Sequence, residues 1–92
     1  MIRSFRDKDT ESVFHQERIK RFQQIASVAL RKLVQIDSAD ELRDVASPPA
    51  NRLEALRGDR AGQYSIRVND QYRICFRWNS GHAFDVEITD YH

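Results

Sequence analysis

Three residues at the end of the 92-residue chain carry side chains that can do chemistry: Asp90, Tyr91 and His92. They follow a segment in which apolar and polar residues alternate, so we expect them at the tip of a β-strand. A carboxylate and an imidazole can transfer protons, and a phenol can donate a hydrogen bond or stack on a base. Chain ends often fray, and the triplet alone is better explained as a polar, solvated tail. Whether the triplet is a solvated tail or part of a functional site must be judged from the residues beside it in the predicted sheet.

Two arginines in the predicted sheet favour a site. Two alternating segments flank one short turn, and the hairpin they predict places Arg67 directly across from Arg73. Like charges in this position destabilise a sheet unless an anion lies between them. An acid from the next strand, Asp85 or Glu87, could neutralise them, and we expect that arrangement for Arg77. For the Arg67–Arg73 pair, a phosphate site is at least as good an explanation.

Alternation also assigns side chains to the two faces of the sheet. Even-numbered positions from Ile66 to Ile88 are apolar and should face the helices. The opposite face should carry these odd-numbered residues: Arg67, Arg73, Cys75, Arg77, Glu87 and Tyr91. A long connection at residues 47–62 is rich in arginine and can close over this face, bringing the carboxylate of Glu54 with it. The prediction is a concave, arginine-lined surface with Tyr91 and His92 at its edge.

These residue types suffice for metal-free cleavage of RNA. A base takes the proton of the ribose 2′-OH, the oxygen attacks the adjacent phosphate, and an acid protonates the leaving 5′-oxygen. His92 is the candidate acid, and Glu54 or Asp90 the base or the group that orients it. Arg73 would stabilise the developing charge, and Tyr91 would position the RNA by stacking. The other candidate phosphate ligands are Arg52, Arg57, Arg60 and Arg67.

The elements before the sheet should form its helical cover. Residues 2–5 alternate and predict a short first strand, and residues 10–15 a short helix. Apolar residues then recur every three or four positions, without Gly or Pro between Glu17 and Asp37, which predicts one helix of about five turns. Its other face would carry five bases: Arg18, Lys20, Arg21, Arg31 and Lys32. This face is either solvated surface or a docking surface for a large anionic partner.

The remaining elements complete a small α+β domain. Ser38 and Glu41 have the spacing of a capping box and predict a second short helix over residues 39–45. Strands over residues 64–68, 72–78 and 84–89 should form an antiparallel meander. The chain is thus expected to be a single domain, residues 1–92, with N-terminal helices packed on one face of a small twisted antiparallel sheet.

Composition excludes several classes of protein. With 15 Lys and Arg against 14 Asp and Glu, the net charge of +1 does not suit a protein that coats nucleic acid. No apolar run approaches the length of a membrane span, and no secretory signal precedes the first strand. The single cysteine, Cys75, cannot form an internal disulfide, and no Cys/His spacing suggests zinc. We therefore expect a cytoplasmic protein without a cofactor or metal.

The chain resembles the HigB toxins of type II toxin–antitoxin systems, within the RelE/ParE superfamily. The resemblance covers essentially all 92 residues. Its carrying motifs are the opening Met1–Phe5, the run Asn51–Gly62 (NRLEALRGDRAG), the strand segments Tyr64–Asn69 and Tyr72–Ile74, and the terminal Asp90–His92.

This resemblance implies a ribosome-dependent mRNA interferase, an endoribonuclease that cuts the codon in the A site and so inhibits translation and growth. It implies a HigA-like antitoxin with a helix-turn-helix domain, whose complex with the toxin binds operator DNA and represses the operon. Arg73, Asp90, Tyr91 and His92 match residues implicated in the activity of such toxins, whereas Glu54 stands where some members have His. The basic helix residues then become candidates for docking to the ribosome.

Two alternatives remain open at this point. ParE-like relatives with this fold inhibit gyrase without cutting RNA, and here the arginine face would bind protein or DNA. A weakened toxin could instead act mainly as an antitoxin partner or co-repressor. The Asp90–His92 ending favours the nuclease, while Glu54 keeps the weakened toxin in consideration.

Overall fold

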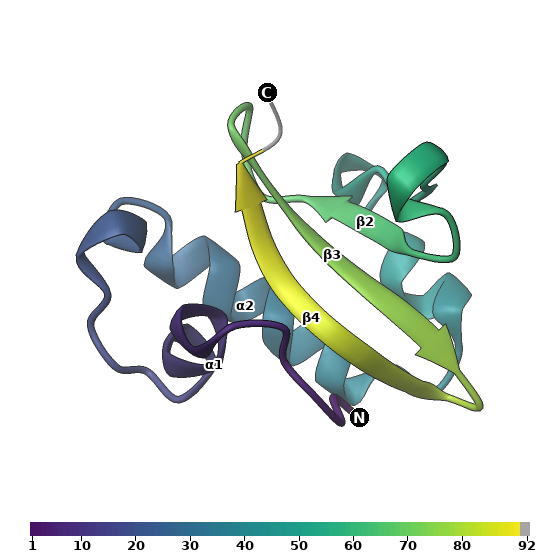
Figure 1. The fold of residues 1–92 in the computed structure, drawn as a ribbon, viewed down its shortest axis with the longest axis horizontal. Helices are drawn as coiled ribbons and strands as arrows, with labels where there is room; N and C mark the ends of the chain where they lie inside the picture. Colours follow the sequence, from purple (N-terminus) through teal and green to yellow (C-terminus); the bar gives the residue numbers. More distant parts are fainter. Residues whose placement is uncertain (91–92) are drawn as a thin grey trace.

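The fold, a computed structural model that describes residues 1–90, has two layers: helices cover one face of a four-stranded antiparallel sheet (Figure 1). The strand order is β1-β2-β3-β4. The helices are α1 (Lys8–Phe14) and α2 (Ala26–Ser38), and the strands are β1 (Glu54–Ala55), β2 (Tyr64–Arg67), β3 (Tyr72–Asn79) and β4 (His82–Asp90). Four short 3₁₀ turns lie between them: η1 (Lys20–Phe22), η2 (Leu42–Ala46), η3 (Pro49–Asn51) and η4 (Gly58–Arg60). The expected α+β class is confirmed.

The predicted hairpin register is also confirmed. The N–H of Val68 donates to the carbonyl of Tyr72 at 3.0 Å, and Arg67 pairs with Arg73 across the strands. The Asn69 side chain closes the turn by accepting from the N–H groups of Gln71 and Tyr72, at 2.9 and 2.7 Å. This local turn fixes the register that sets the two arginines side by side.

A β-bulge in β4 changes the predicted assignment of faces. Arg77 pairs with Phe84 and Cys75 with Glu87, so two residues of β4 lie opposite the single residue between them on β3. The extra residue is Asp85, which has a positive φ of 53°. In the part of β4 that precedes the bulge, the side-chain alternation is reversed relative to the prediction, so Ala83 rather than Phe84 joins the buried core. The expectation that Phe84 faces the helices was therefore wrong.

The first residues cover the outer edge of β4 rather than forming a regular strand. Ile2 and Phe5 make isolated parallel bridges to Ala83 and Val86. Backbone N–H groups of Arg3 and Arg6 donate to β4 carbonyls at 2.8 and 3.0 Å. The prediction of a separate strand at residues 2–5 was thus only partly correct, although the segment does join the sheet edge.

The single five-turn helix predicted between Glu17 and Asp37 was wrong. The chain forms η1 first, and α2 begins only at Ala26. Phe22 is fully buried, with its ring centroid 5.7 Å from that of Tyr72 in an edge-to-face contact. Burying Phe22 against the sheet requires a turn away from the helix axis, so tertiary packing overrides an uninterrupted helical pattern.

The loop region between α2 and β2 also differs from expectation in its details. The Ser38 hydroxyl donates to the carbonyl of Val34 within α2, and the capping box lies three residues later than predicted, between Glu41 and Asp44. The short helix predicted at residues 39–45 is the 3₁₀ turn η2. Residues 47–62 contain η3, β1 and η4 rather than irregular chain, and β1 adds a strand beside β2.

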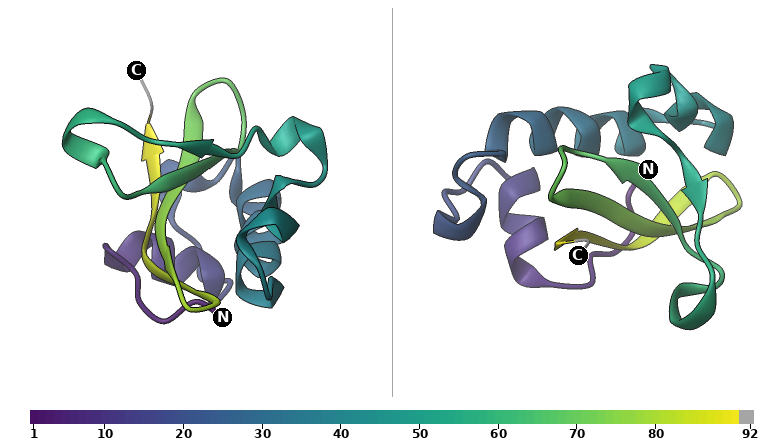
Figure 2. Two further views of the ribbon diagram at one scale, coloured as in Figure 1. Left: turned by 90° about the vertical axis from the view of Figure 1, so that its right-hand side faces the viewer. Right: turned by 90° about the horizontal axis from the view of Figure 1, so that it is seen from above.

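The core lies between α2 and the sheet, with α1 packed beside them (Figure 2). It contains Phe22, Leu33, Ile36, Val45, Ile66, Ile74, Phe76 and Val86, all fully buried. Within residues 1–90, no helix is long and apolar enough to cross a membrane. The opposite face of the sheet is left for polar side chains, and it holds the candidate site.

Candidate functional site

Arg73 lies on this polar face near the start of β3 and is held by groups from two elements. Its Nε donates to the Ser65 hydroxyl at 2.8 Å, and one terminal nitrogen donates to the carbonyl of Arg52 at 2.7 Å. Only 11% of its side chain is exposed. A guanidinium fixed in this way loses little rotamer freedom when it meets an anion. The guanidinium is therefore already held in one position in the sheet before it meets any anion.

Within residues 1–90, the acidic side chain that forms an ion pair with Arg73 is Glu54. Strand β1 pairs Glu54 with Ser65, and one Glu54 oxygen lies 4.0 Å from the Arg73 nitrogen. The Glu54 side chain is 54% exposed. A hollow of about 530 Å³ lies along Glu54–Arg57. The structure therefore brings Glu54 close to Arg73, and Glu54 and Arg57 line one open hollow.

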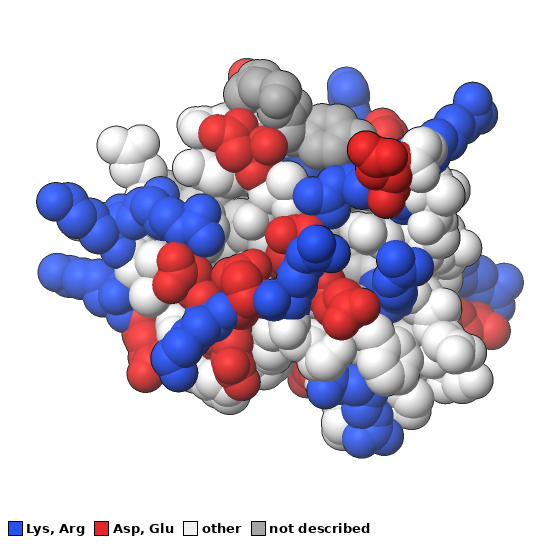
Figure 3. Space-filling model, in the orientation of Figure 1, with Lys and Arg blue, Asp and Glu red and all other residues white. Residues whose placement is uncertain are grey.

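A second charged cluster fastens the loop to the sheet. Arg60 donates to Glu87 at 2.8 Å and to the side chain of Gln63 at 3.1 Å. Arg6 reaches the same Glu87 oxygen at 3.8 Å. Acidic and basic side chains are accordingly interspersed on the face of the sheet turned away from α2 (Figure 3). Beneath them Cys75 is fully buried, and burial is the main cause that raises the pKa of its thiol.

The other two sheet arginines have acidic partners of their own. Arg67 and Arg73 are paired across the strands, but their guanidinium groups bind different partners. Arg67 forms an ion pair with Asp70 in the adjacent turn, whereas Arg73 bonds to Ser65 and the Arg52 carbonyl. Arg77 lies 3.6 Å from Asp85, as expected. The predicted phosphate held between Arg67 and Arg73 is thus not required to relieve their repulsion, because each has its own partners.

The chain end is only partly described. Asp90 pairs with Tyr72 in the sheet and accepts from the Gln71 side chain at 3.0 Å. This register places Asp90 on the face of Tyr72, opposite to that of Arg73. Tyr91 and His92 lie outside the described residues. Among the described residues, Arg73 and Glu54 therefore lie close together on the polar face, whereas Asp90 lies on the other face of the sheet.

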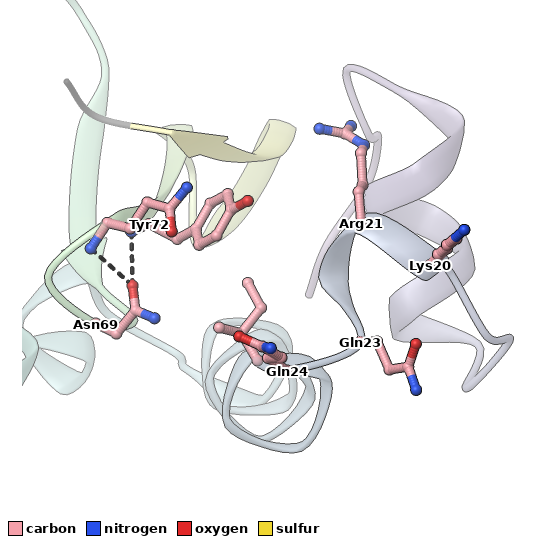
Figure 4. Close-up of a pocket in the computed structure, with 8 residues that line it drawn as sticks. Lys20, Arg21, Gln23, Gln24, Asn69 and Tyr72 are labelled. Atoms are coloured by element: carbon pink, nitrogen blue, oxygen red, sulfur yellow. Dashed lines mark hydrogen bonds between the residues drawn. The ribbon is translucent and has the colours of Figure 1, made fainter.

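The five bases predicted on one helix face fall into two separate groups. Arg31 and Lys32 lie on α2, and burial, followed by the charges of Arg31 and Arg67, lowers the pKa of Lys32. The remaining three precede α2: Arg18, Lys20 and Arg21. Lys20 and Arg21 line a hollow of about 550 Å³ whose opposite wall includes Asn69 and Tyr72 (Figure 4). Arg21 also pairs with Asp9 at 2.9 Å.

Sequence reasoning missed the groups that hold Arg73. Ser65 is fully buried and occupies an odd-numbered position on the arginine face, so the alternation itself could have identified it. The Arg52 carbonyl could not be found in this way, because a backbone acceptor leaves no signal in residue type. Arg52 was predicted as a phosphate ligand, and its side chain is exposed while its carbonyl contacts Arg73. No group of three or more metal-ligating residues occurs within residues 1–90.

Solved structures share this fold over almost their whole length. YoeB in the heterotetrameric YoeB–YefM toxin–antitoxin complex from Staphylococcus aureus has a TM-score of 0.61 at 22% identity, covering 100% of this chain and 98% of that chain. The YoeB dimer from the same organism has a TM-score of 0.60, also at 22% identity, covering 99% and 94% of the two chains. The fold is thus that of the small YoeB-type toxins.

Sequence comparison identifies the family. Residues 3–92 match the model of the RelE-like toxin of the type II toxin–antitoxin system HigB, and the chain belongs to this family. Toxin HigB-1 of Vibrio cholerae is 38% identical over 90 residues, which are 96% of this chain and 95% of the relative. Endoribonuclease HigB of Proteus vulgaris is 36% identical over 61 residues, 66% and 65% of the two chains. The resemblance drawn from the sequence motifs is confirmed.

Proposed function

We propose that the chain is a ribosome-dependent mRNA endoribonuclease that acts in the cytoplasm and is neutralised by a HigA-like antitoxin. The observation that carries the proposal is the Arg73 guanidinium, anchored by Ser65 and the Arg52 carbonyl and beside the half-exposed Glu54. Membership of the HigB family supports it, as does the endoribonuclease activity named for the Proteus vulgaris relative.

Each step of the reaction then has a group in this chain. Glu54 takes the proton from the ribose 2′-OH, which attacks the adjacent phosphate and displaces the 5′-oxygen. His92 protonates that oxygen as it leaves, and Arg73 stabilises the negative charge that builds on the phosphate. Tyr91 positions the RNA by stacking on a base. Loop arginines Arg52, Arg57 and Arg60, with Arg67, contact flanking phosphates.

Replacing His92 by alanine should lower the cleavage rate of mRNA on programmed ribosomes by about 10²- to 10⁴-fold, because a general acid typically contributes that factor. The measurement is the appearance of codon-phased 5′-ends in a single-turnover assay. Melting of the variant, followed by circular dichroism, controls for folding. Cleavage at the wild-type rate would remove His92 from the mechanism.

The same assay separates this proposal from its competitors. Induction of the chain in cells should produce codon-phased mRNA ends and leave DNA supercoiling unchanged. Gyrase trapping without new RNA ends would instead identify a ParE-like gyrase inhibitor. Absence of growth inhibition and of cleavage, with retained binding to the antitoxin, would identify a weakened toxin serving as a co-repressor.

We further propose that the two basic groups, Arg31 with Lys32 and Arg18 with Lys20 and Arg21, contact ribosomal RNA. Arg31 is exposed on α2, and charge reversal there should reduce ribosome affinity and lower the salt slope of binding by about one, as expected for one phosphate contact. Cosedimentation at several salt concentrations measures both quantities. Lys8→Glu, an equal charge change at an exposed residue of α1, is the matched control. Equal effects of the two reversals would show only a general charge effect.

A further inference from the structure

Asn51 is a fully buried polar residue at the end of η3. It directly precedes Arg52, whose carbonyl contacts Arg73. Its Nδ2 donates to the carbonyls of Val45 and Ser47 at 3.0 and 3.3 Å and to the side chain of Gln35 at 3.0 Å. Its Oδ1 accepts from the ammonium of Lys32. One amide therefore joins α2, η2 and the start of the loop.

The residue that follows has an unusual backbone. Arg52 has φ 48° and ψ 58°, in the left-handed region, which a residue with a Cβ adopts at a cost unless its surroundings fix it. In this conformation its carbonyl turns toward the sheet and accepts from Arg73 at 2.7 Å. Two residues further on, Glu54 enters β1 and approaches the same guanidinium. The direction of the chain after Asn51 thus sets two contacts of Arg73.

We propose that Asn51 is a positioning residue for the reaction, whose buried amide fixes the left-handed turn at Arg52 and thereby the Arg73 guanidinium. The expected loss of kcat rests on the proposed function, whereas the expected displacement of the Arg73 guanidinium does not. Asn51 does not touch the polar face itself. Its amide needs both a donor and an acceptor, because three of its contacts are to oxygen atoms and one is to an ammonium.

Asn51→Asp is the sharpest test, because it keeps the shape and the acceptor for Lys32 while replacing all donors of the amide by an acceptor. A displaced Arg73 should lower kcat about 10²-fold, the usual effect of a misplacement of about 1 Å, and change KM much less. Val45→Ala is the matched control: it destabilises the same segment from a fully buried position but keeps the backbone carbonyl that accepts from Asn51. Both variants are compared at temperatures where each is fully folded.

A readout independent of activity is the nitrogen–proton resonance of the Arg73 Nε, which the bond to Ser65 protects from exchange with water. Asn51→Asp should shift this resonance and abolish its protection, whereas Val45→Ala should preserve both. Gln35→Ala, which removes one partner of the amide at a partly exposed site, should shift it in the same direction by less. This variant provides the measurement if Asn51→Asp does not fold.

The outcomes separate the two proposals. If the wild-type chain cuts no RNA, the proposed function fails, and the Arg73 resonance still tests the role of Asn51. If Asn51→Asp and Val45→Ala lower kcat equally at equal stability, or if the Arg73 resonance is unchanged in the Asn51 and Gln35 variants, the positioning role is overturned. In an Arg73→Ala background, Asn51→Asp should lower kcat much less than in the wild type, and fully additive losses would also contradict the positioning role.

Discussion

Replacement of Arg73 by alanine is expected to lower the rate of mRNA cleavage by about 10²- to 10³-fold, the effect of removing one donor from a site that stabilises developing negative charge. The expectation follows from the fixed position of the guanidinium rather than from its charge alone. Its Nε and one terminal nitrogen are occupied by Ser65 and the Arg52 carbonyl, which aim the group at the polar face. The loss should appear in kcat under single-turnover conditions on programmed ribosomes.

Lysine at this position should not restore the rate. A single ammonium cannot reproduce the planar fork that bonds Ser65 and Arg52 and still faces the substrate. Arg77→Ala is the matched control, since Arg77 lies on the same strand and face, is about half exposed and pairs with Asp85 at 3.6 Å. It should retain cleavage to within a few-fold.

Stability must be measured alongside activity. Removing Arg73 leaves the Ser65 hydroxyl and the Arg52 carbonyl without their donor, which costs about 1–3 kcal/mol when such groups are buried. Chemical denaturation gives this cost, and cleavage is then assayed where the variant is fully folded. Full activity of folded Arg73→Ala, with normal growth inhibition in cells, would contradict the proposed phosphate-stabilising role.

The largest expected effect on stability is that of Phe22→Ala, which should lower the free energy of unfolding by about 3–5 kcal/mol. Phe22 is fully buried, packs edge-to-face on Tyr72 at 5.7 Å, and has the Arg21 guanidinium 4.1 Å from its ring centre. Its loss leaves a cavity between η1 and β3 in a small domain whose total stability is typically about 5–15 kcal/mol. Urea denaturation of the free chain measures the change.

Val34→Ala is the control for this variant, because Val34 is an exposed apolar residue on α2 and its truncation should change stability by less than about 0.5 kcal/mol. A small effect of Phe22→Ala, comparable with that of the control, would mean that η1 is not anchored by this ring. The departure from the predicted long helix would then need another cause.

The strands were predictable because their signal is local. Alternation and the Asn69–Gln71 turn fix the register of β2 and β3, and the Arg67–Arg73 pair follows from it. The break at Phe22 was not predictable, since it depends on contact with Tyr72, fifty positions away in the sequence. The bulge at Asp85 was not predictable either, because the apolar and polar residues of this segment alternate as in a regular strand and the extra residue appears only in the pairing with β3.

The candidate site divides in the same way. Arg73 could be chosen from residue type and strand parity, and Glu54 as a carboxylate in the arginine-rich loop; the structure brings the two together. Ser65 could also have been chosen by its parity, but Asn51 and the Arg52 carbonyl could not, because they act through backbone conformation and burial. Asp90 was assigned to the site by its place in the terminal triplet, whereas its register with Tyr72 places it on the other face.

The bridges between residues 2–6 and β4 have a consequence for synthesis. The Ser4 hydroxyl accepts from the backbone N–H of Asp85 over a separation of 81 residues, so a nascent chain cannot complete this edge until Asp85 has been synthesised. Contacts between the first and last segments delay folding, because a long loop must close before they form. Ser65 and Cys75, which line the polar face, lie on strands that also emerge late. The polar face would therefore be assembled only after the strands that carry it have been synthesised.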